Sequence, residues 1–110
     1  DALHQMNLWR AEFSEQMNDI DALVTPTTID CAIPVDEVDE QVLPAHFTRA
    51  TNVLGLCALA IPSAHSPDDL PISICIHGHP FHDSHILRIG WALEQALGES
   101  SRIPRGLELE

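Results

Sequence analysis

The 110-residue chain contains no lysine, and its five basic residues, all arginine, stand against 17 acidic residues for a net charge of −12. A surface of that sign repels the phosphates of nucleic acids and the head groups of anionic membranes. We therefore expect neither a nucleic acid nor a membrane as a partner.

Long apolar runs are also lacking. No run approaches the roughly 20 apolar residues that cross a bilayer, and the first residues do not resemble a signal peptide. The sequence therefore predicts a cytoplasmic protein. Its hydrophobic content of 45 % is that of a globular domain, or of part of one.

The chain has few cysteines, and their spacing does not indicate disulfide pairs. Cys31, Cys57 and Cys75 are far apart and form no CxxC motif. The last two lie inside apolar runs, where free cysteine behaves as a small hydrophobic residue. We expect reduced thiols, with neither a disulfide nor a catalytic cysteine.

The first residues carry a helical pattern. Apolar residues recur there at spacings of three and four: Leu3, Met6, Trp9, Phe13 and Met17. This periodicity predicts a helix over residues 2–18 with one apolar face. The pattern holds from its first residue without a recognisable cap, so we expect the chain to begin within a longer helix.

A strand, a loop and a second helix should follow. Residues 20–24 predict a short strand that Pro26 ends, because proline cannot donate to a strand ladder. Residues 29–43 have no period and carry four acids between positions 36 and 40, which indicates a solvated loop with room for one helical turn. Residues 45–57 then predict a helix with Gly55 near its end.

Two apolar runs, at residues 58–61 and 72–76, flank a polar segment at residues 63–70. This pattern predicts two strands joined by a loop, the first of them ended by Pro62. Their weak alternation favours a sheet covered by helices on both faces. We expect these two strands to form an antiparallel pair within a mixed sheet.

The last helix should begin after an N-cap at Asp83 or Ser84 and end at Gly98. Its predicted buried side consists of Ile86, Leu87, Ile89, Gly90, Leu93 and Leu97. Residues 99–110 have no periodicity and end in Leu-Glu-Leu-Glu, which is typical of a cloning remnant.

The order of elements is thus helix, strand, loop, helix, strand, strand, helix. It predicts an α/β fold, a three-layer sandwich fragment with a small mixed sheet, over residues 1–98. The irregular tail of residues 99–110 stands apart from that fragment.

Four stretches, in this order, resemble the C-terminal end of the amidase signature family of serine amide hydrolases. They are DALVTPTT at 21–28, FTRATNVLGLCALAIP at 47–62, DLPISICIHGHPFHD at 69–83 and ILRIGWALE at 86–94. The resemblance implies a parent enzyme that hydrolyses amide C–N bonds. It also implies a chain several times longer than this one.

Catalysis in that family runs through a serine, a cis-serine and a lysine on an earlier Gly/Ser-rich segment. The present sequence has no lysine, and its only serine pair, Ser100-Ser101, lacks flanking glycines. The resemblance therefore assigns no catalytic residue and no cofactor here. We expect a C-terminal segment that is inactive alone and whose partner is the N-terminal part of the parent amidase.

The sequence departs from the family pattern at several positions. Asp69 and Ser73 stand where glycines are expected, and Cys75 replaces a glutamine. Aspartate tolerates a left-handed backbone better than most residues, so Asp69 can keep the turn. Ala45 and His46 occupy the place of a substrate-holding acid in the tRNA-dependent glutamine amidotransferases, which argues against that branch.

Four histidines lie close together in the sequence: His77, His79, His82 and His85. Imidazoles in such a group could hold zinc or nickel, with His77 and His79 leaving a strand end on one side. The family pattern places no metal there, and exposed histidines at a strand-to-helix turn need no ligand. We predict no metal site and keep a metal-binding protein as an alternative hypothesis.

A segment cut from a larger sandwich exposes a sheet edge and the apolar faces of two helices. Such surfaces pair with copies of themselves. We therefore expect a dimer or higher oligomer, with the N-terminal helix as the element available for exchange. A stand-alone oligomerisation or binding module derived from the amidase fold is the second functional hypothesis.

Overall fold

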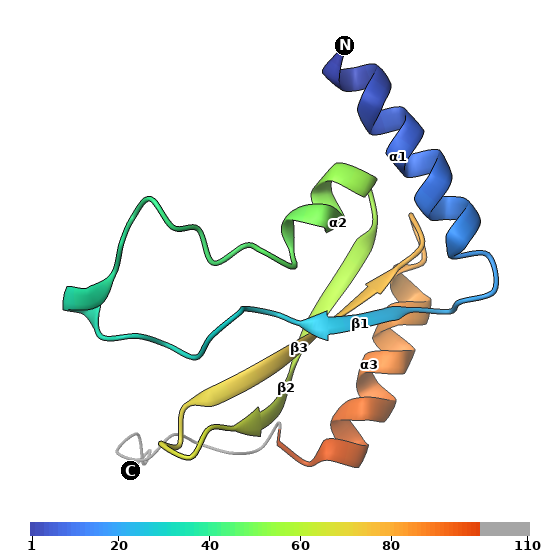
Figure 1. Cartoon of the computed structure of the whole chain (residues 1–110). Helices are drawn as coiled ribbons and strands as arrows, with labels where there is room; N and C mark the ends of the chain where they lie inside the picture. The colour runs from blue at the N-terminus through green and yellow to red at the C-terminus, as the bar shows by residue number, and fades with distance from the viewer. Residues whose placement is uncertain (100–110) are drawn as a thin grey trace.

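The computed structural model describes residues 1–99 as a small sheet with helices on its two faces (Figure 1). The elements are α1 (Ala2–Gln16), β1 (Leu23–Pro26), the 3-10 helix η1 (Val35–Glu37), α2 (Arg49–Leu54), β2 (Cys57–His65), β3 (Pro71–Gly78) and α3 (Asp83–Leu97). The predicted order of elements is confirmed, including the helical turn in the acidic loop. The tail predicted at 99–110 falls, apart from Glu99, outside the described residues.

The sheet has the strand order β1-β3-β2, and both of its strand pairs are antiparallel. The α/β class and the β2–β3 pair are confirmed, but the predicted parallel component is absent from the described sheet. β1 and β2 run in the same direction, yet β3 lies between them and opposes both. The sheet would be mixed only if β1 and β2 were neighbours.

Two prolines were predicted to end strands, and only one of them does. Pro26 is the last residue of β1, as predicted, and pairs with Ile74, whereas Pro62 lies inside β2 and pairs with Ser73 just before an irregularity in the register. Both prolines belong to edge strands, where a missing N–H can point away from the ladder. The position of each strand in the sheet, and not its local sequence, decides this outcome.

The core lies between the sheet and α3, where Ile61, Ile76 and Ile86 are buried together. Glycine lets the helix approach closely, since a Cβ atom on Gly90 would lie 2.3 Å from Leu59 Cδ2. The predicted burial of Ile86 and Gly90 is confirmed.

Two residues of α3 that were predicted to be buried lie on its outer side. Leu87 is 58 % exposed and Leu97 is also exposed, so their predicted burial is wrong. The helix packs on β2 and β3 only through the side that carries Ile86 and Gly90.

The glycines predicted to end helices are confirmed, whereas the polar residues predicted to begin α3 are not. Gly55 and Gly98 adopt left-handed backbones, with φ of 72° and 70°, and end α2 and α3 as predicted. At the start of α3, however, the N-cap is His82 and makes no side-chain capping bond. The predicted caps at Asp83 and Ser84 are wrong.

The N-terminal part of the molecule has little packing of its own. Figure 1 shows α1 projecting from the sheet, and residues 27–48, hereafter the arm, looping out away from α3. Of the predicted apolar face only Met17, just after the end of α1, is buried, and no residue within α1 itself is. Arg10 ties α1 to α2 by donating from Nε to the Val53 carbonyl at 2.8 Å.

Two further predictions for this region need correction. The first turn of α1 is capped, because the Asp1 carboxylate accepts from the Leu3 N–H at 3.3 Å. α2 is shorter than the predicted helix, covering only Arg49–Leu54. No helix within residues 1–99 is long and apolar enough to span a bilayer.

Candidate functional site

His77 lies on the face of the sheet opposite to α3. Successive side chains of a strand point to opposite faces. A Cβ atom on Gly78 would meet Ile86 of α3, so His77 points to the opposite face, toward α2. His79 follows the end of β3, and the cavities lined by His77 and by His79 share Phe13, Leu54 and Leu56, which agrees with the predicted common side.

His77 is held in a buried polar network. It is 3 % exposed, with Thr25 Oγ1 2.9 Å from Nε2 and Thr51 Oγ1 2.7 Å from Nδ1. A neutral imidazole has one donor and one acceptor nitrogen, so one threonine accepts and the other donates. Burial lowers the pKa of His77, which keeps the ring neutral at pH 7. The network joins β1, β3 and α2.

A cavity of about 200 Å³ adjoins this network. Its walls are mainly apolar and include Phe13 of α1, Phe47 and Leu54, with His46 at the same cavity. Thr25 and Thr51 were not identified as partners of His77 from the sequence, because only the pairing of β1 with β3 and the packing of α2 bring them together. Neither lies near His77 in the chain.

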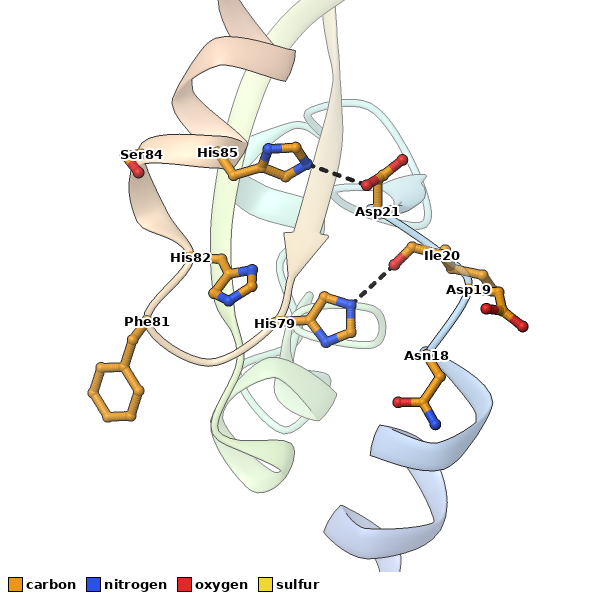
Figure 2. Close-up of a pocket in the computed structure, with 9 residues that line it drawn as sticks. All are labelled: Asn18, Asp19, Ile20, Asp21, His79, Phe81, His82, Ser84 and His85. Atoms are coloured by element: carbon orange, nitrogen blue, oxygen red, sulfur yellow. Dashed lines mark hydrogen bonds and ion pairs between the residues drawn. The ribbon is translucent and has the colours of Figure 1, made fainter.

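The other three histidines line an open depression of about 630 Å³ beside the start of α3 (Figure 2). It lies where the segment between α1 and β1 meets the segment between β3 and α3. Its lining residues are Asn18, Asp19, Ile20, Asp21, His79, Phe81, His82, Ser84 and His85. Most of these residues are polar.

Two contacts fix the histidines at either end of this depression. His79 donates from Nε2 to the Ile20 carbonyl at 2.9 Å. His85 points Nε2 at Asp21 Oδ1 at 3.5 Å, while Arg88 donates to its Nδ1 at 3.1 Å. Figure 2 shows both contacts reaching across to the segment that leads into β1.

His82 lies next to His79, and their ring centres are 5.4 Å apart with planes inclined at 50°. Across residues 1–99, no three side chains of His, Cys, Asp or Glu are placed to surround a metal ion. The four histidines of the sequence cluster are thus one buried residue, His77, and three residues that line the depression, of which His82 is exposed and His79 and His85 are half-buried.

The turn between β3 and α3 contains an unusual backbone. Phe81 has φ of 64°, and Asp69 in the β2–β3 loop has φ of 66°. The tolerance expected of Asp69 for this conformation is confirmed. Phe81 was not foreseen, because an aromatic residue is rarely found there.

The cysteines are free thiols, as predicted. Burial raises the pKa of the Cys75 thiol, so it stays protonated and is a poor nucleophile. Cys57 donates from Sγ to the His79 carbonyl at 3.1 Å. Both lie within the sheet and support its packing.

Comparison with known proteins gives the chain a family. The family model described as amidase matches residues 1–87. The chain is 31 % identical over 101 residues to a glutamyl-tRNA(Gln) amidotransferase subunit of Halothermothrix orenii, covering 89 % of this chain and 21 % of that protein. It is 35 % identical over 101 residues to a fatty acid amide hydrolase of Medicago truncatula, covering 84 % of this chain and 17 % of that protein.

Solved structures agree with these relatives. The corresponding glutamyl-tRNA(Gln) amidotransferase protein of Thermotoga maritima superposes with a TM-score of 0.68 at 31 % identity, over 82 % of this chain and 21 % of that one. A crystal structure of an amidase superposes with a TM-score of 0.80 at 24 % identity, over 89 % of this chain and 24 % of that one, which supports the fold alone.

The chain spans about a fifth of the length of the curated relatives that it matches. Amidotransferase proteins are among them, so the exclusion of that branch on the basis of Ala45 and His46 stays a prediction. The match over residues 1–87 and the order of its elements agree with the motifs in the sequence. The chain belongs to the amidase family.

Proposed function

We propose that this chain is the C-terminal structural segment of an amide-bond hydrolase. In the larger enzyme it completes the sheet and one wall of the substrate cleft, and it carries none of the catalytic triad. The observation behind this proposal is the amount of apolar side chain that the chain leaves uncovered.

Most of the uncovered side chains occupy three separate places. Each of the following is at least 40 % exposed: Leu3, Leu8 and Trp9 on α1; Ile29, Ile33, Val35, Val38, Val42 and Leu43 on the arm; Leu87, Trp91 and Leu97 on α3. Burying apolar surface is worth about 25 cal/mol per Å². A larger protein that covers α1 and the arm would therefore gain substantial stability from doing so.

The chemistry of the chain fits a supporting role. Nucleophilic catalysis by serine needs a nearby base and donors for the developing oxyanion. The sequence has no lysine to serve as that base, and arginine stays protonated in proteins. His77, the most buried histidine, is already engaged by two threonines. The lysine and the serine pair would come from the upstream part of the enzyme.

An amide-hydrolysis assay tests the absence of a triad. The purified chain is incubated with small primary amides, and ammonia is measured over time. We expect no release above buffer. Release proportional to the chain concentration, together with labelling of one of its serines by a fluorophosphonate, would overturn the proposal.

The DNA upstream of the Asp1 codon tests the parentage. We expect an open reading frame of several hundred codons that encodes a lysine followed by a Gly/Ser-rich segment. Supplying that upstream part in trans should give amide hydrolysis that depends on this chain. A stop codon directly upstream would contradict the proposal.

The exposed apolar side chains also favour a second function, that of a stand-alone oligomerisation module. In that case the chain would cover its own exposed surfaces by pairing with a copy of itself. Sedimentation equilibrium at high protein concentration distinguishes the two hypotheses. A folded species that stays strictly monomeric excludes the module.

A further inference from the structure

We propose that His79 and His82 together bind one divalent late first-row transition ion, with Zn²⁺ as the representative. The site is the turn of residues 79–82 between β3 and α3. This inference does not depend on the proposed function, because it rests only on the geometry of that turn and its neighbours.

The turn holds the two histidines side by side. It is closed by the His82 N–H, which donates to the His79 carbonyl at 3.1 Å. Pro80 takes its second position and Phe81, with φ of 64°, its third, the pattern of a type II turn. The third position of such a turn normally needs glycine or asparagine.

Phe81 offers no packing that would explain this strain. Its side chain is 97 % exposed, and Figure 2 shows it pointing outward, away from His79. Strained backbones in native proteins gather at functional sites, where the surroundings enforce them. In this turn the enforced feature is the proximity of two imidazoles.

The separation of the rings suits a shared ion. A zinc–nitrogen bond is about 2.0–2.1 Å, and two imidazoles on one tetrahedral ion have ring centres about 5 Å apart. The ring centres of His79 and His82 are 5.4 Å apart. In the proposed site His79 keeps its bond to the Ile20 carbonyl, and the His82 side chain turns to bring one of its nitrogens to the ion.

His79 is already oriented as a metal ligand would be. Metal-binding histidines almost always donate their second N–H to a carbonyl or a carboxylate. His79 donates from Nε2 to the Ile20 carbonyl at 2.9 Å, so the proton sits on Nε2 and the Nδ1 lone pair is free. Over residues 1–99, no hydrogen bond or ion pair occupies the ring nitrogens of His82.

The remaining coordination positions belong to water. Three protein ligands do not converge within the described part of the chain, and the depression of about 630 Å³ is open to solvent. Imidazole selects Zn²⁺, Ni²⁺ or Cu²⁺ over Mg²⁺, which prefers oxygen ligands. A structural zinc site has four protein ligands, and this site has two. With about half the binding free energy of such a site, we expect a dissociation constant on the order of 10 µM.

The test is a calorimetric titration of the full chain, prepared without a histidine tag, with ZnCl₂ at pH 7.5. We expect one ion per chain, and a loss of affinity of about tenfold or more in His79→Ala and in His82→Ala. His4→Ala and Cys31→Ser are matched controls away from the turn and should bind as the wild type does. Mg²⁺ should not compete.

His82→Ala decides the matter, because His79→Ala also removes the bond to Ile20. Circular dichroism should show that His82→Ala is folded, and saturating zinc should raise its melting temperature less than that of the wild type. No binding at millimolar zinc would overturn the proposal. So would equal weakening by the two control variants, or equal binding of Mg²⁺.

Discussion

The two halves of the described chain contain apolar side chains in similar supply but use them differently. In the C-terminal half, β2, β3 and α3 bury Ile61, Cys75, Ile76 and Ile86 against one another. In the N-terminal half, from α1 to α2, only Met17 is a buried hydrophobic residue. The first half forms secondary structure, and the second half forms a core.

An amphipathic pattern is often taken to indicate both that a helix forms and that its apolar face is buried, and this chain separates the two. α1 and α3 both carry apolar residues at helical spacing, and both form. Only α3 has a surface to pack on, because the β2–β3 pair lies beside it. A hydrophobic stripe predicts that a helix has a partner, and α1 has found none among residues 1–99 beyond the link to α2.

The largest expected effect lies at the centre of the core. Ile76 is fully buried, whereas Val24, its partner across the sheet, is 49 % exposed. Ile76→Ala should lower the free energy of unfolding by about 2–5 kcal/mol, because it leaves a cavity. Val24→Ala should cost less than about 1 kcal/mol. Urea denaturation of both variants checks this, and equal losses would contradict the division into two halves.

Overpacking at Gly78 should have the next largest effect. A Cβ atom there would lie 2.3 Å from Ile86 Cγ1 and 3.1 Å from Cys57 Sγ, so Gly78→Ala must displace the Ile86 side chain or move α3. We expect a loss of about 1–3 kcal/mol by urea denaturation. Ala64→Val, at an exposed position of β2, is the control and should change stability by less than about 0.5 kcal/mol. A neutral Gly78→Ala would show that the core is loose.

The third prediction concerns pH and the contact between the halves at His77. The folded pKa of His77 is lowered by burial, so the unfolded chain takes up this proton first as pH falls. Neutral His77 therefore makes its full contribution to the free energy of unfolding above about pH 6.5, which is the pKa of histidine in an unfolded chain. This contribution is lost as pH falls below that value. His77→Gln should remove that part of the pH dependence. Urea midpoints of both proteins between pH 5 and 8 test this, and parallel curves would refute it.

The smallest effect on stability is expected at the exposed aromatic residues. Trp9 on α1 is 50 % exposed and Trp91 on α3 is 66 % exposed. Trp9→Gln and Trp91→Gln should each change the free energy of unfolding by about 0.5 kcal/mol or less. Under the oligomerisation hypothesis, sedimentation velocity should show weaker self-association for at least one of these two variants. Unchanged behaviour in both would count against contacts through α1 and α3.

Local patterns allowed the elements and the family to be predicted from sequence. The hairpin, both glycine-ended helices and the acidic loop depend on residues close together in the chain. Two of the failures involve information that only the folded sheet contains. Pro62 is tolerated inside β2 because that strand lies at an edge, and Leu87 is exposed because α3 presents its other side to the sheet.

The histidine cluster shows the same limit at the candidate site. Four nearby imidazoles look like one group in the sequence, but strand alternation sends His77 to the face opposite α3. Its partners, Thr25 and Thr51, come from β1 and α2. The strained Phe81 could not be foreseen, because Pro-Phe carries no signal for a left-handed residue.

The strand order has a consequence for how the chain assembles. β2, β3 and α3 are consecutive, so their contacts close short loops and can form early. β1 must find β3 across the whole arm, α2 and β2, and it joins the sheet as a four-residue edge strand. In native-state hydrogen exchange, the amides of β1 should therefore open at lower free energy than those of β3. The N-terminal half would be the last part to join the fold and the first to leave it.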